Sequence, residues 1–344
     1  MQLSSKYLYS LATSALLLLL TVCARAATLN VPADYATIQA AINAAKAGDV
    51  VVVAAGTYHE SVDWENKDLT LLGAGPDQTI VDPGVANGGP GGRCLFAAGL
   101  TSASLIDGFT LQNGQVLGFN QPDGGGILAN GSSLTVSNCI LRGNSAVGAG
   151  GGIATNSNSG LTLRKCTIVG NQSRGRGAGM RNISNSGATI IECVFQGNRN
   201  LSVGGGGLAD EQGSNSTLIG CLFTGNIAAV RGGGIAEFNS SSTITGCVFT
   251  GNHGATGGAI NLASSNSTVK DCAMSGNSAD GSGGAVNVEF DCACTMTNCT
   301  ITANSSASFL SAVAITSNRP SLIAVAMCSV ATEIFPCSHC SPTS

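Results

Sequence analysis

A repeat of about 27 residues constrains the fold of this chain more than any other feature of its sequence. Seven cysteines open near-identical segments, at spacings of 25 to 28 residues. An apolar residue stands three positions before and two positions after each cysteine, and an asparagine stands five positions after it. A fixed period in this range indicates stacked supersecondary units. The cysteine column is Cys139, Cys166, Cys193, Cys221, Cys247, Cys272 and Cys299, and the asparagine column is Asn144, Asn171, Asn198, Asn226, Asn252, Asn277 and Asn304.

The pattern within each repeat predicts short strands and tight corners. Apolar residues recur at strand-like intervals, and glycine and asparagine separate them as turns require. A second signature, GGGI at Gly150–Ile153, recurs with small changes in the following repeats. We therefore predict an all-β chain, a single right-handed parallel β-helix of about ten to eleven rungs. Rungs that pair ~4.8 Å apart stack identical side chains, so the asparagines should form hydrogen-bonded ladders and the cysteines a buried column of thiols.

The two ends of the chain differ from the repeats. Residues 1–26 have the layout of a secretory signal peptide, with an apolar run that includes Leu16–Leu20 and a small-x-small site at Ala24–Ala26. The run is too short to span a membrane. We predict one β-helix domain over 27–344. Its cap and first rungs are 27–105, its regular repeats 106–304 and its degenerate rungs 305–344.

The start of the domain is predicted to carry a capping helix. Asp34 is positioned to N-cap a short amphipathic helix through Ile38 and Ala45 that ends at Gly48. Such a helix would cover the open end of the core. Asp49–Glu60 then has the pattern of the first buried strand.

Composition narrows the classes of partner. Charged residues are 10 % of the chain, against ~25 % in an ordinary soluble domain, and the net charge is −4. A nucleic-acid partner would favour a strongly basic overall composition, which this chain lacks. We expect an exported monomer with no membrane-spanning segment, whose partner is an extracellular polysaccharide or a cell-surface glycan.

Two stretches resemble known families. Residues 31–82, which include VPADYATIQAAINAAKAGDVVVVAAGTYHE, resemble the start of pectin-lyase-like right-handed β-helix proteins. Residues 106–304, with their C-x-x-x-G-N and GG signatures, are similar to the repeats of polymorphic outer membrane protein passengers. The resemblance implies a fold that carries lyases, hydrolases, esterases, epimerases and adhesins. The downstream aspartate motifs of pectin methylesterases and polygalacturonases are not found here.

One column holds the candidate functional residues. Two positions after the GG-apolar triplets, stacking would align Asn182, Asp210 and Glu237 at ~5 Å intervals. Two carboxylates at that separation suit a retaining glycosidase or a calcium site. The alternative that we favour is an exposed face on which two acids coincide. The catalytic candidates are Asp210, Glu237 and Arg181, the ligand-binding candidates are Asn182, Asp210, Glu211 and Glu237, and no metal site is predicted.

A threonine column and the cysteines outside the main column leave further alternatives. Threonines stand four residues before each ladder cysteine, from Thr135 to Thr295, and should point outward. Such arrays suit ice binding, but Arg164 and Lys270 interrupt the neighbouring column, and β-branched residues are common on strand surfaces. Cys292 with Cys294, and Cys337 with Cys340, are better disulfide candidates than the ladder cysteines. The pairing of Cys94 is left open.

The regular columns, the scarce charges and the incomplete catalytic set favour a non-enzymatic role. We expect a secreted or cell-surface protein with a structural, adhesive or glycan-contacting function and no cofactor. The first alternative is a polysaccharide lyase or glycoside hydrolase, with Ca²⁺ if it is a lyase. The second alternative is an ice-binding β-helix.

Overall fold

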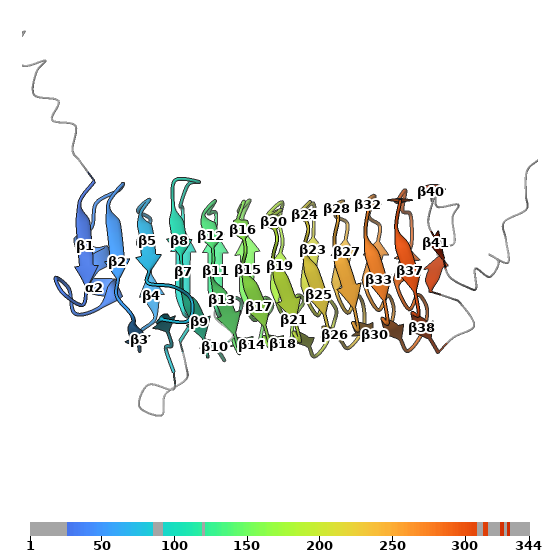
Figure 1. Cartoon of the computed structure of the whole chain (residues 1–344), viewed down its shortest axis with the longest axis horizontal. Coiled ribbons are helices and arrows are strands. Elements are labelled where there is room, and N and C mark those ends of the chain that lie inside the picture. The colour runs from blue at the N-terminus through green and yellow to red at the C-terminus, as the bar shows by residue number, and fades with distance from the viewer. Residues whose placement is uncertain are drawn as a thin grey trace, which may run out of the picture.

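The computed structural model describes residues 26–84, 92–118, 121–307, 312–315, 324–326 and 329–330. This part of the chain winds into a rod of short strands, with the helix α2 (Ile38–Ala44) at its N-terminal end (Figure 1). Four sheets run along the rod, and neighbouring strands within each sheet are parallel. The prediction of an all-β, single parallel β-helix with a short N-terminal helix is confirmed.

Four sheets, here named A to D, contain the described strands. Sheet A has 12 strands: β1 (Thr28–Val31), β2 (Val50–Val53), β5 (Thr70–Gly73), β8 (Leu105–Asp107), β12 (Thr135–Ser137), β16 (Thr162–Arg164), β20 (Thr189–Ile191), β24 (Thr217–Ile219), β28 (Thr243–Thr245), β32 (Thr268–Lys270), β36 (Thr295–Thr297) and β40 (Ala324–Ala326). Sheet B has 11: β3 (Gly56–Tyr58), β6 (Thr79–Val81), β9 (Thr110–Gln112), β13 (Ile140–Arg142), β17 (Thr167–Val169), β21 (Val194–Gln196), β25 (Leu222–Thr224), β29 (Val248–Thr250), β33 (Ala273–Ser275), β37 (Thr300–Thr302) and β41 (Ser329–Val330). Sheet C has 10: β4 (Val62–Asp63), β7 (Leu95–Ala98), β11 (Ile127–Asn130), β15 (Ile153–Asn156), β19 (Met180–Asn182), β23 (Leu208–Glu211), β27 (Ile235–Phe238), β31 (Ile260–Ala263), β35 (Val286–Glu289) and β39 (Val313–Ile315). Sheet D has 8: β10 (Gln115–Val116), β14 (Ser145–Ala146), β18 (Gln172–Ser173), β22 (Arg199–Asn200), β26 (Ile227–Ala228), β30 (His253–Gly254), β34 (Ser278–Ala279) and β38 (Ser305–Ser306).

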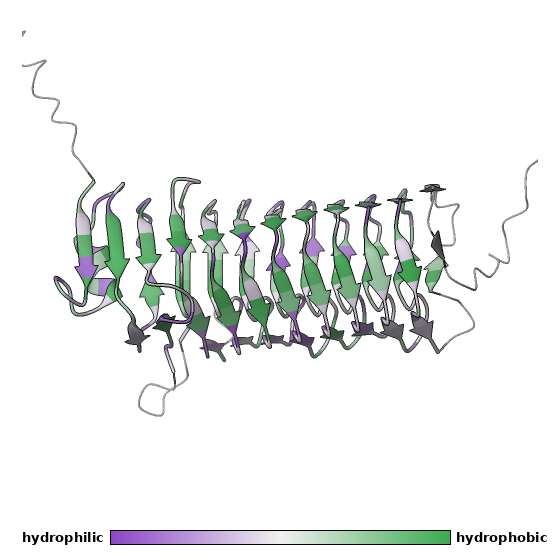
Figure 2. Ribbon diagram, viewed as in Figure 1, coloured by the Kyte–Doolittle hydropathy of each residue, from purple (hydrophilic) through white to green (hydrophobic). Residues whose placement is uncertain are grey.

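The core of the rod consists of stacked columns of identical or similar side chains. The strands of the long sheets are largely apolar, and their inward residues lie at the same register in successive rungs (Figure 2). Phe195, Phe223 and Phe249 are fully buried, with ring centroids 4.7 and 5.0 Å apart along the stack. The threonine column lies on the outer face of sheet A, as predicted, with Thr162 paired to Thr135 and Thr189.

The asparagine column forms the predicted hydrogen-bonded ladder. Asn171 Oδ1 accepts bonds from the backbone N–H and the Nδ2 of Asn144, at 3.0 and 3.1 Å. Asn144 Nδ2 also donates to the carbonyl of Leu111. The same set recurs between successive ladder asparagines as far as Asn304. The ladder therefore satisfies the polar groups of one buried corner along the whole regular part of the rod.

The ladder cysteines are free, buried thiols, as predicted. Cys139 is 1 % exposed, and burial raises the pKa of its thiol to about 12. Cys292 and Cys294, the better disulfide candidates, are also free. Their thiols donate instead to backbone carbonyls, including that of Ser265 from Cys294 at 2.9 Å. Cys94, whose pairing was left open above, is also a buried, free thiol.

We predict that the seven ladder thiols are unreactive in the folded protein. Attack on a disulfide reagent requires an accessible thiolate, and these side chains are at most 2 % exposed. Titration with a chromogenic aromatic disulfide should detect them only after addition of denaturant. Rapid reaction of these seven side chains under native conditions, located by mass spectrometry, would contradict the buried column.

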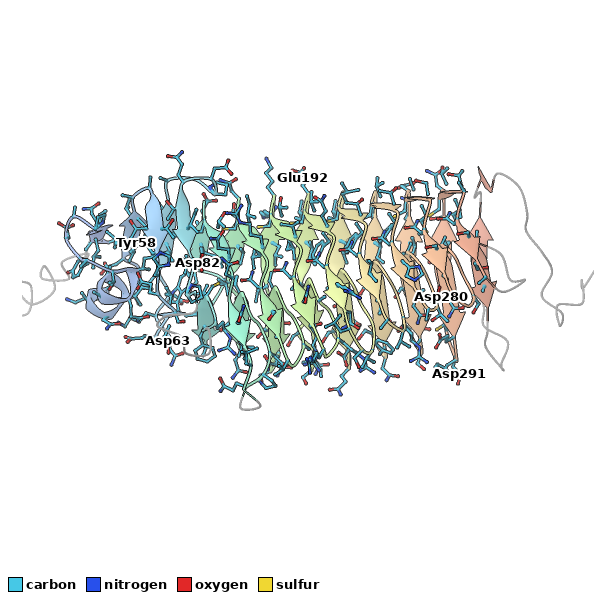
Figure 3. All side chains as sticks on the ribbon, turned by 90° about the horizontal axis from the view of Figure 1, so that it is seen from below. Tyr58, Asp63, Asp82, Glu192, Asp280 and Asp291 are labelled. Carbon is cyan, nitrogen blue, oxygen red and sulfur yellow. The ribbon has the colours of Figure 1, made fainter. Side chains whose placement is uncertain are left out.

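The capping helix is present, but its cap differs from the prediction. The N-cap is Thr37, whose hydroxyl accepts from the backbone N–H of Ala40, and the helix ends at Ala44 rather than near Gly48. Asp34 is not the cap because its carboxylate accepts from the backbone N–H and the Nδ2 of Asn30, at 3.0 and 2.8 Å. The segment Asp49–Glu60, predicted as one strand, contains β2 and β3, and Figure 3 places Tyr58 of β3 in the first rungs.

Several predictions concern residues outside the described part. The apolar core of the predicted signal peptide, Cys337 and Cys340 lie there, and the segment 305–344, predicted as degenerate rungs, is described only in part. Within the described residues, no helix combines the length and the apolar composition needed to cross a bilayer.

Candidate functional site

The structure aligns the candidate column but places it inside the rod. Asn182 pairs in register with Asp210, and Asp210 with Glu237, as predicted from the repeat spacing. All three side chains are 0 % exposed. Leu208 and Asp210 alternate with Ala209 along β23, so the carboxylate shares the inward face with a core leucine.

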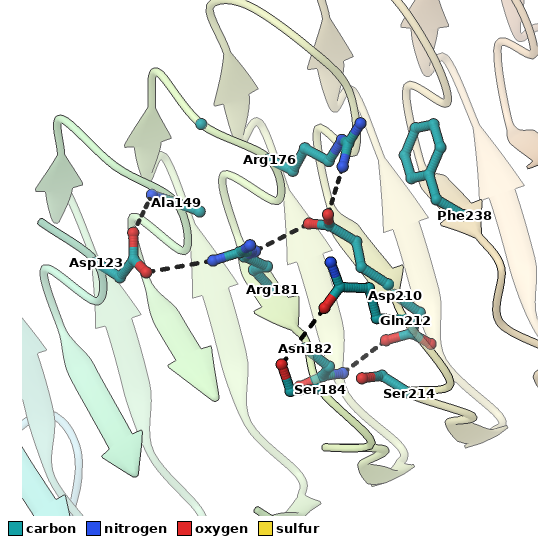
Figure 4. Close-up of polar contacts among 12 residues, drawn as sticks. Asp123, Ala149, Arg176, Arg181, Asn182, Ser184, Asp210, Gln212, Ser214 and Phe238 are labelled. Carbon is teal, nitrogen blue, oxygen red and sulfur yellow. Dashed lines mark hydrogen bonds and ion pairs between the residues drawn. The ribbon is translucent and has the colours of Figure 1, made fainter. Parts of the chain in front are cut away.

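Hydrogen bonds link these side chains from rung to rung (Figure 4). Asn182 Nδ2 donates to Asp210 Oδ1 at 2.7 Å. The hydroxyl of Ser242 donates to Asp210 Oδ2 at 2.9 Å. The hydroxyl of Ser267 donates to Glu237 Oε2. The other oxygen, Glu237 Oε1, is buried without a hydrogen-bond partner among the described residues. Burial raises the pKa of Asp210 to about 6, and burial followed by the charge of Asp210 raises the pKa of Glu237 to about 8.

The favoured expectation that Asp210 and Glu237 lie on an exposed face is therefore wrong. All four residues of β23 are buried, because one side faces the core and the other is covered by chain. A polymer outside the rod cannot contact either carboxylate. Arg181 and Glu211, which were grouped with this column, point to the opposite side of the same sheet.

Glycine-rich loops between sheets D and C cover the outer face of sheet C. Successive loops form backbone hydrogen bonds with one another along the rod; for example, the N–H of Gly150 donates to the carbonyl of Arg176. Gly177 shows why the GG signature is needed. Its φ is +64°, and an added Cβ would lie 2.1 Å from the carbonyl oxygen of Met180. Only glycine allows the loop to pass this close to the strand.

Charged side chains from these loops and strands form a chain of ion pairs on the outer face (Figure 4). Arg181 Nη1 lies 3.2 Å from Asp123 Oδ2, and Arg181 Nε lies 2.9 Å from Glu211 Oε1. Glu211 Oε2 accepts from Arg176 Nη1. The second oxygen of Asp123 accepts from the backbone N–H of Ala149 at 2.7 Å. We call Asp123, Arg176, Arg181 and Glu211 the ion-pair chain.

A second polar cluster continues the face toward the C-terminal end of the rod. The ring of Phe238 lies between the two, with Arg176 Cζ 4.1 Å and Arg231 Cζ 5.8 Å from its centroid. Arg231 Nε contacts Glu289 Oε2 at 2.9 Å. Asn287 Nδ2 donates to Glu289 Oε1 at 2.9 Å, and its own Oδ1 is buried without a partner among the described residues.

The outer face of sheet C has the size of a site for an extended ligand. A shallow cavity of about 280 Å³ lies over the ion-pair chain, between the loops that contain Ala149 and Val203. The polar row from β11 to β35 spans six rung intervals, or roughly 29 Å at ~4.8 Å each. In this row, guanidinium and carboxylate groups alternate in a chain that is only 10 % charged. Such groups can donate and accept hydrogen bonds with a hydroxyl-rich polymer.

Sequence reasoning found only part of this face. Arg181 and Glu211 were singled out, but Asp123, Arg176 and Arg231 were missed. Arg176 and Arg231 directly precede the glycines of the GG loops, and that shared position was the available signal. Within the described part of the chain, no three histidine, cysteine, aspartate or glutamate side chains gather closely enough to hold a metal ion.

Comparison with known proteins identifies the fold. A model described as right handed beta helix region matches residues 177–321. The PL6 family alginate lyase AlyGC aligns over 84 % of this chain, with a TM-score of 0.54 and 17 % identity, and a mutant of it gives 0.54 and 19 %. A pectin methylesterase in complex with a hexasaccharide gives only 0.39 and 10 %, over 90 % of each chain. No curated protein matches the chain.

These likenesses establish a right-handed parallel β-helix of the pectin-lyase-like fold, as residues 31–82 led us to expect. The chain spans 40 % of the length of the alginate lyase chains. Sequence identities below 20 % show only that the fold is shared. The same fold is shared with the alginate lyase AlyGC. The likeness of the repeats to polymorphic outer membrane proteins receives no support from these comparisons and stays a prediction.

Proposed function

We propose that this chain is an exported, non-enzymatic protein that binds an extracellular polysaccharide or a cell-surface glycan along the outer face of sheet C. The observation that carries the proposal is the ion-pair chain. It borders a cavity between the glycine-rich loops and spans several rungs, in a protein of which only 10 % of the residues are charged. The side chains of Arg181 and Asp123 are 17 and 18 % exposed, so their edges contact solvent.

The geometry favours binding over cleavage. Asp210 and Glu237, the carboxylates with raised pKa values, lie inside the rod and cannot reach a glycosidic bond. Glu211 lies on the outer side of sheet C, but each of its carboxylate oxygens forms an ion pair with an arginine. A general acid or base must be within hydrogen-bond reach of the proton it transfers, and both oxygens of Glu211 are already occupied. The fold shared with the alginate lyase AlyGC supports a glycan as the ligand class.

We predict that Arg181→Ala weakens polysaccharide binding at least about tenfold, or ~1.4 kcal/mol. The change removes contacts to both Asp123 and Glu211 and opens the centre of the ion-pair chain. Affinity electrophoresis or calorimetry against a panel of neutral and acidic polysaccharides would measure it. Arg164→Ala, an exposed arginine on sheet A, is the matched control and should bind as wild type does.

Circular dichroism must show the same β-rich spectrum for both variants. If Arg181→Ala and wild type bound every polymer with equal affinity, the outer face of sheet C would not be the binding site. A degradation screen on the same panel, with calcium and with chelator, tests the enzymatic alternative. Product release would overturn the non-enzymatic part of the proposal.

A further inference from the structure

The charges of this chain are divided along the rod. Residues 142–199 contain seven basic residues and one acidic residue, a formal charge of +6. Residues 27–141 contain three basic and ten acidic residues, and residues 200–344 contain three and eight. Figure 3 labels Asp63 and Asp82 in the first rungs, Asp280 and Asp291 toward the C-terminal end, and Glu192, the one acidic residue of the middle segment. The middle of an acidic rod is therefore strongly basic.

Two of the basic side chains lie together on the outer face of sheet D, outside the ion-pair chain. Arg199 begins β22 of this sheet. Gln172 pairs in register with Arg199, so Arg174, two residues further along, is a diagonal neighbour of Arg199 on the same outward face. Both side chains are exposed, and within the described residues neither of them forms an ion pair. We call Arg174 and Arg199 the basic face.

An apolar recess adjoins the basic face. Leu117 and Leu201 are 50 and 43 % exposed, and together with Val147 and Arg174 they line a recess of about 170 Å³. Guanidinium groups beside an aliphatic floor suit a ligand with acidic substituents and an apolar ring face. Arg174, which lines the recess, stands two residues before Arg176 of the ion-pair chain.

We propose that the basic face binds the acidic groups of an anionic polysaccharide, so that the glycan is a polymer bearing carboxylates or sulfate esters. This inference rests on the proposed function, because it names the class of the polymer bound at the neighbouring face. Unpaired guanidinium groups take planar or tetrahedral oxyanions in bidentate fashion. The arginines of the ion-pair chain already hold carboxylates of the protein, whereas those of the basic face retain their charge for a ligand.

The chemistry of the face favours a polysaccharide over a nucleic acid. Recognition of single strands relies on aromatic side chains that stack on bases, and the basic face and its recess contain none.

The test compares two double variants with the same change in charge. Arg174→Gln with Arg199→Gln alters the basic face, and Arg164→Gln with Lys165→Gln alters the sheet A side of the same rungs. The probes are a polyuronate, a sulfated galactan, an uncharged glucan and a single-stranded DNA, each at low and at physiological salt. We expect wild type to bind the polyuronate or the sulfated polymer, with affinity that falls as salt rises. The first double variant should lose about tenfold or more, and the second should not.

Each outcome decides the proposal. Preference for the polyuronate assigns carboxylates as the ligand groups, and preference for the sulfated polymer assigns sulfate. Binding of the glucan with equal affinity, unchanged in the first double variant, overturns the anionic ligand but leaves the proposed function intact. Absence of binding to any polysaccharide overturns both. Preferential binding of DNA overturns the choice of polymer class.

Discussion

Raising the pH from 5 to 8 is expected to destabilise the wild-type rod, and Glu237→Gln is expected to remove most of that loss. Glu237 is fully buried one rung from Asp210, and no cation contacts either carboxylate among the described residues. Burial, followed by the charge of Asp210, raises the pKa of Glu237 from 4.5 to about 8. The folded protein therefore holds a proton on this carboxyl group at neutral pH.

The direction of the effect follows from proton counting. Between pH 4.5 and about 8 the unfolded chain has released the proton of Glu237, while the folded chain still binds it. Stability then falls as pH rises, by roughly 1.4 kcal/mol per pH unit for one proton. The pKa of Asp210, raised from 3.8 to about 6, adds to the loss in the lower part of this range. We expect a total loss of up to about 4 kcal/mol between pH 5 and 8.

Urea unfolding followed by circular dichroism at pH 5, 6.5 and 8 measures this dependence. At pH 5 the protonated glutamic acid and glutamine are similar in shape and charge, so Glu237→Gln should change the free energy of unfolding little. At pH 8 the variant should be the more stable protein. Glu192→Gln, at an exposed glutamate, is the control and should retain the wild-type slope. A parallel decrease of wild type and Glu237→Gln with pH would show that this buried carboxyl group does not titrate as described.

The sequence was sufficient to predict the columns of sheets A and B. In those strands one face is buried and the other is in solvent, so Leu163 and Ile190 alternate with outward Thr162 and Thr189. The period of two residues is then visible in the sequence. The ladder asparagines were equally predictable, because a corner that buries its polar groups requires the same hydrogen-bonding side chain in every rung.

Sheet C could not be predicted in the same way, because loops cover its outer face. Along β23 both the inward Asp210 and the outward Glu211 are buried, so burial does not alternate with sequence. Which acid faces the core depends on the register set by Leu208 and on a loop that folds back from sheet D. Arg181 pairs with Asp123, 58 positions away, and with Glu211, 30 positions away, and no local pattern encodes these contacts. The candidate acids were therefore found, but Asp210 and Glu237 were assigned to an exposed face and lie inside the rod.

The asparagine ladder gives a second prediction with a large effect. Asn226 is fully buried in the middle of the column. Its Nδ2 donates to the carbonyl of Phe195 at 2.8 Å and to Asn252 Oδ1 at 2.9 Å. Its Oδ1 accepts from the backbone N–H and the Nδ2 of Asn198, at 3.1 and 2.9 Å. One side chain thus satisfies polar groups of the rung before it and contacts the rung after it.

We expect Asn226→Ala to lower the free energy of unfolding by about 3–5 kcal/mol, because a buried donor or acceptor left unpaired costs roughly 1–3 kcal/mol. The substitution leaves the N–H of Asn198 and the carbonyl of Phe195 without their partner. Asn215→Ala is the matched control, since this exposed asparagine accepts one bond, from the backbone N–H of Ser241. It should cost less than about 1 kcal/mol in the same urea titration. If the two variants lost equal stability, the ladder asparagines would mark the register of the rungs without stabilising their stacking. A much larger loss for Asn226→Ala would show that the ladder stabilises the stacking of one rung on the next.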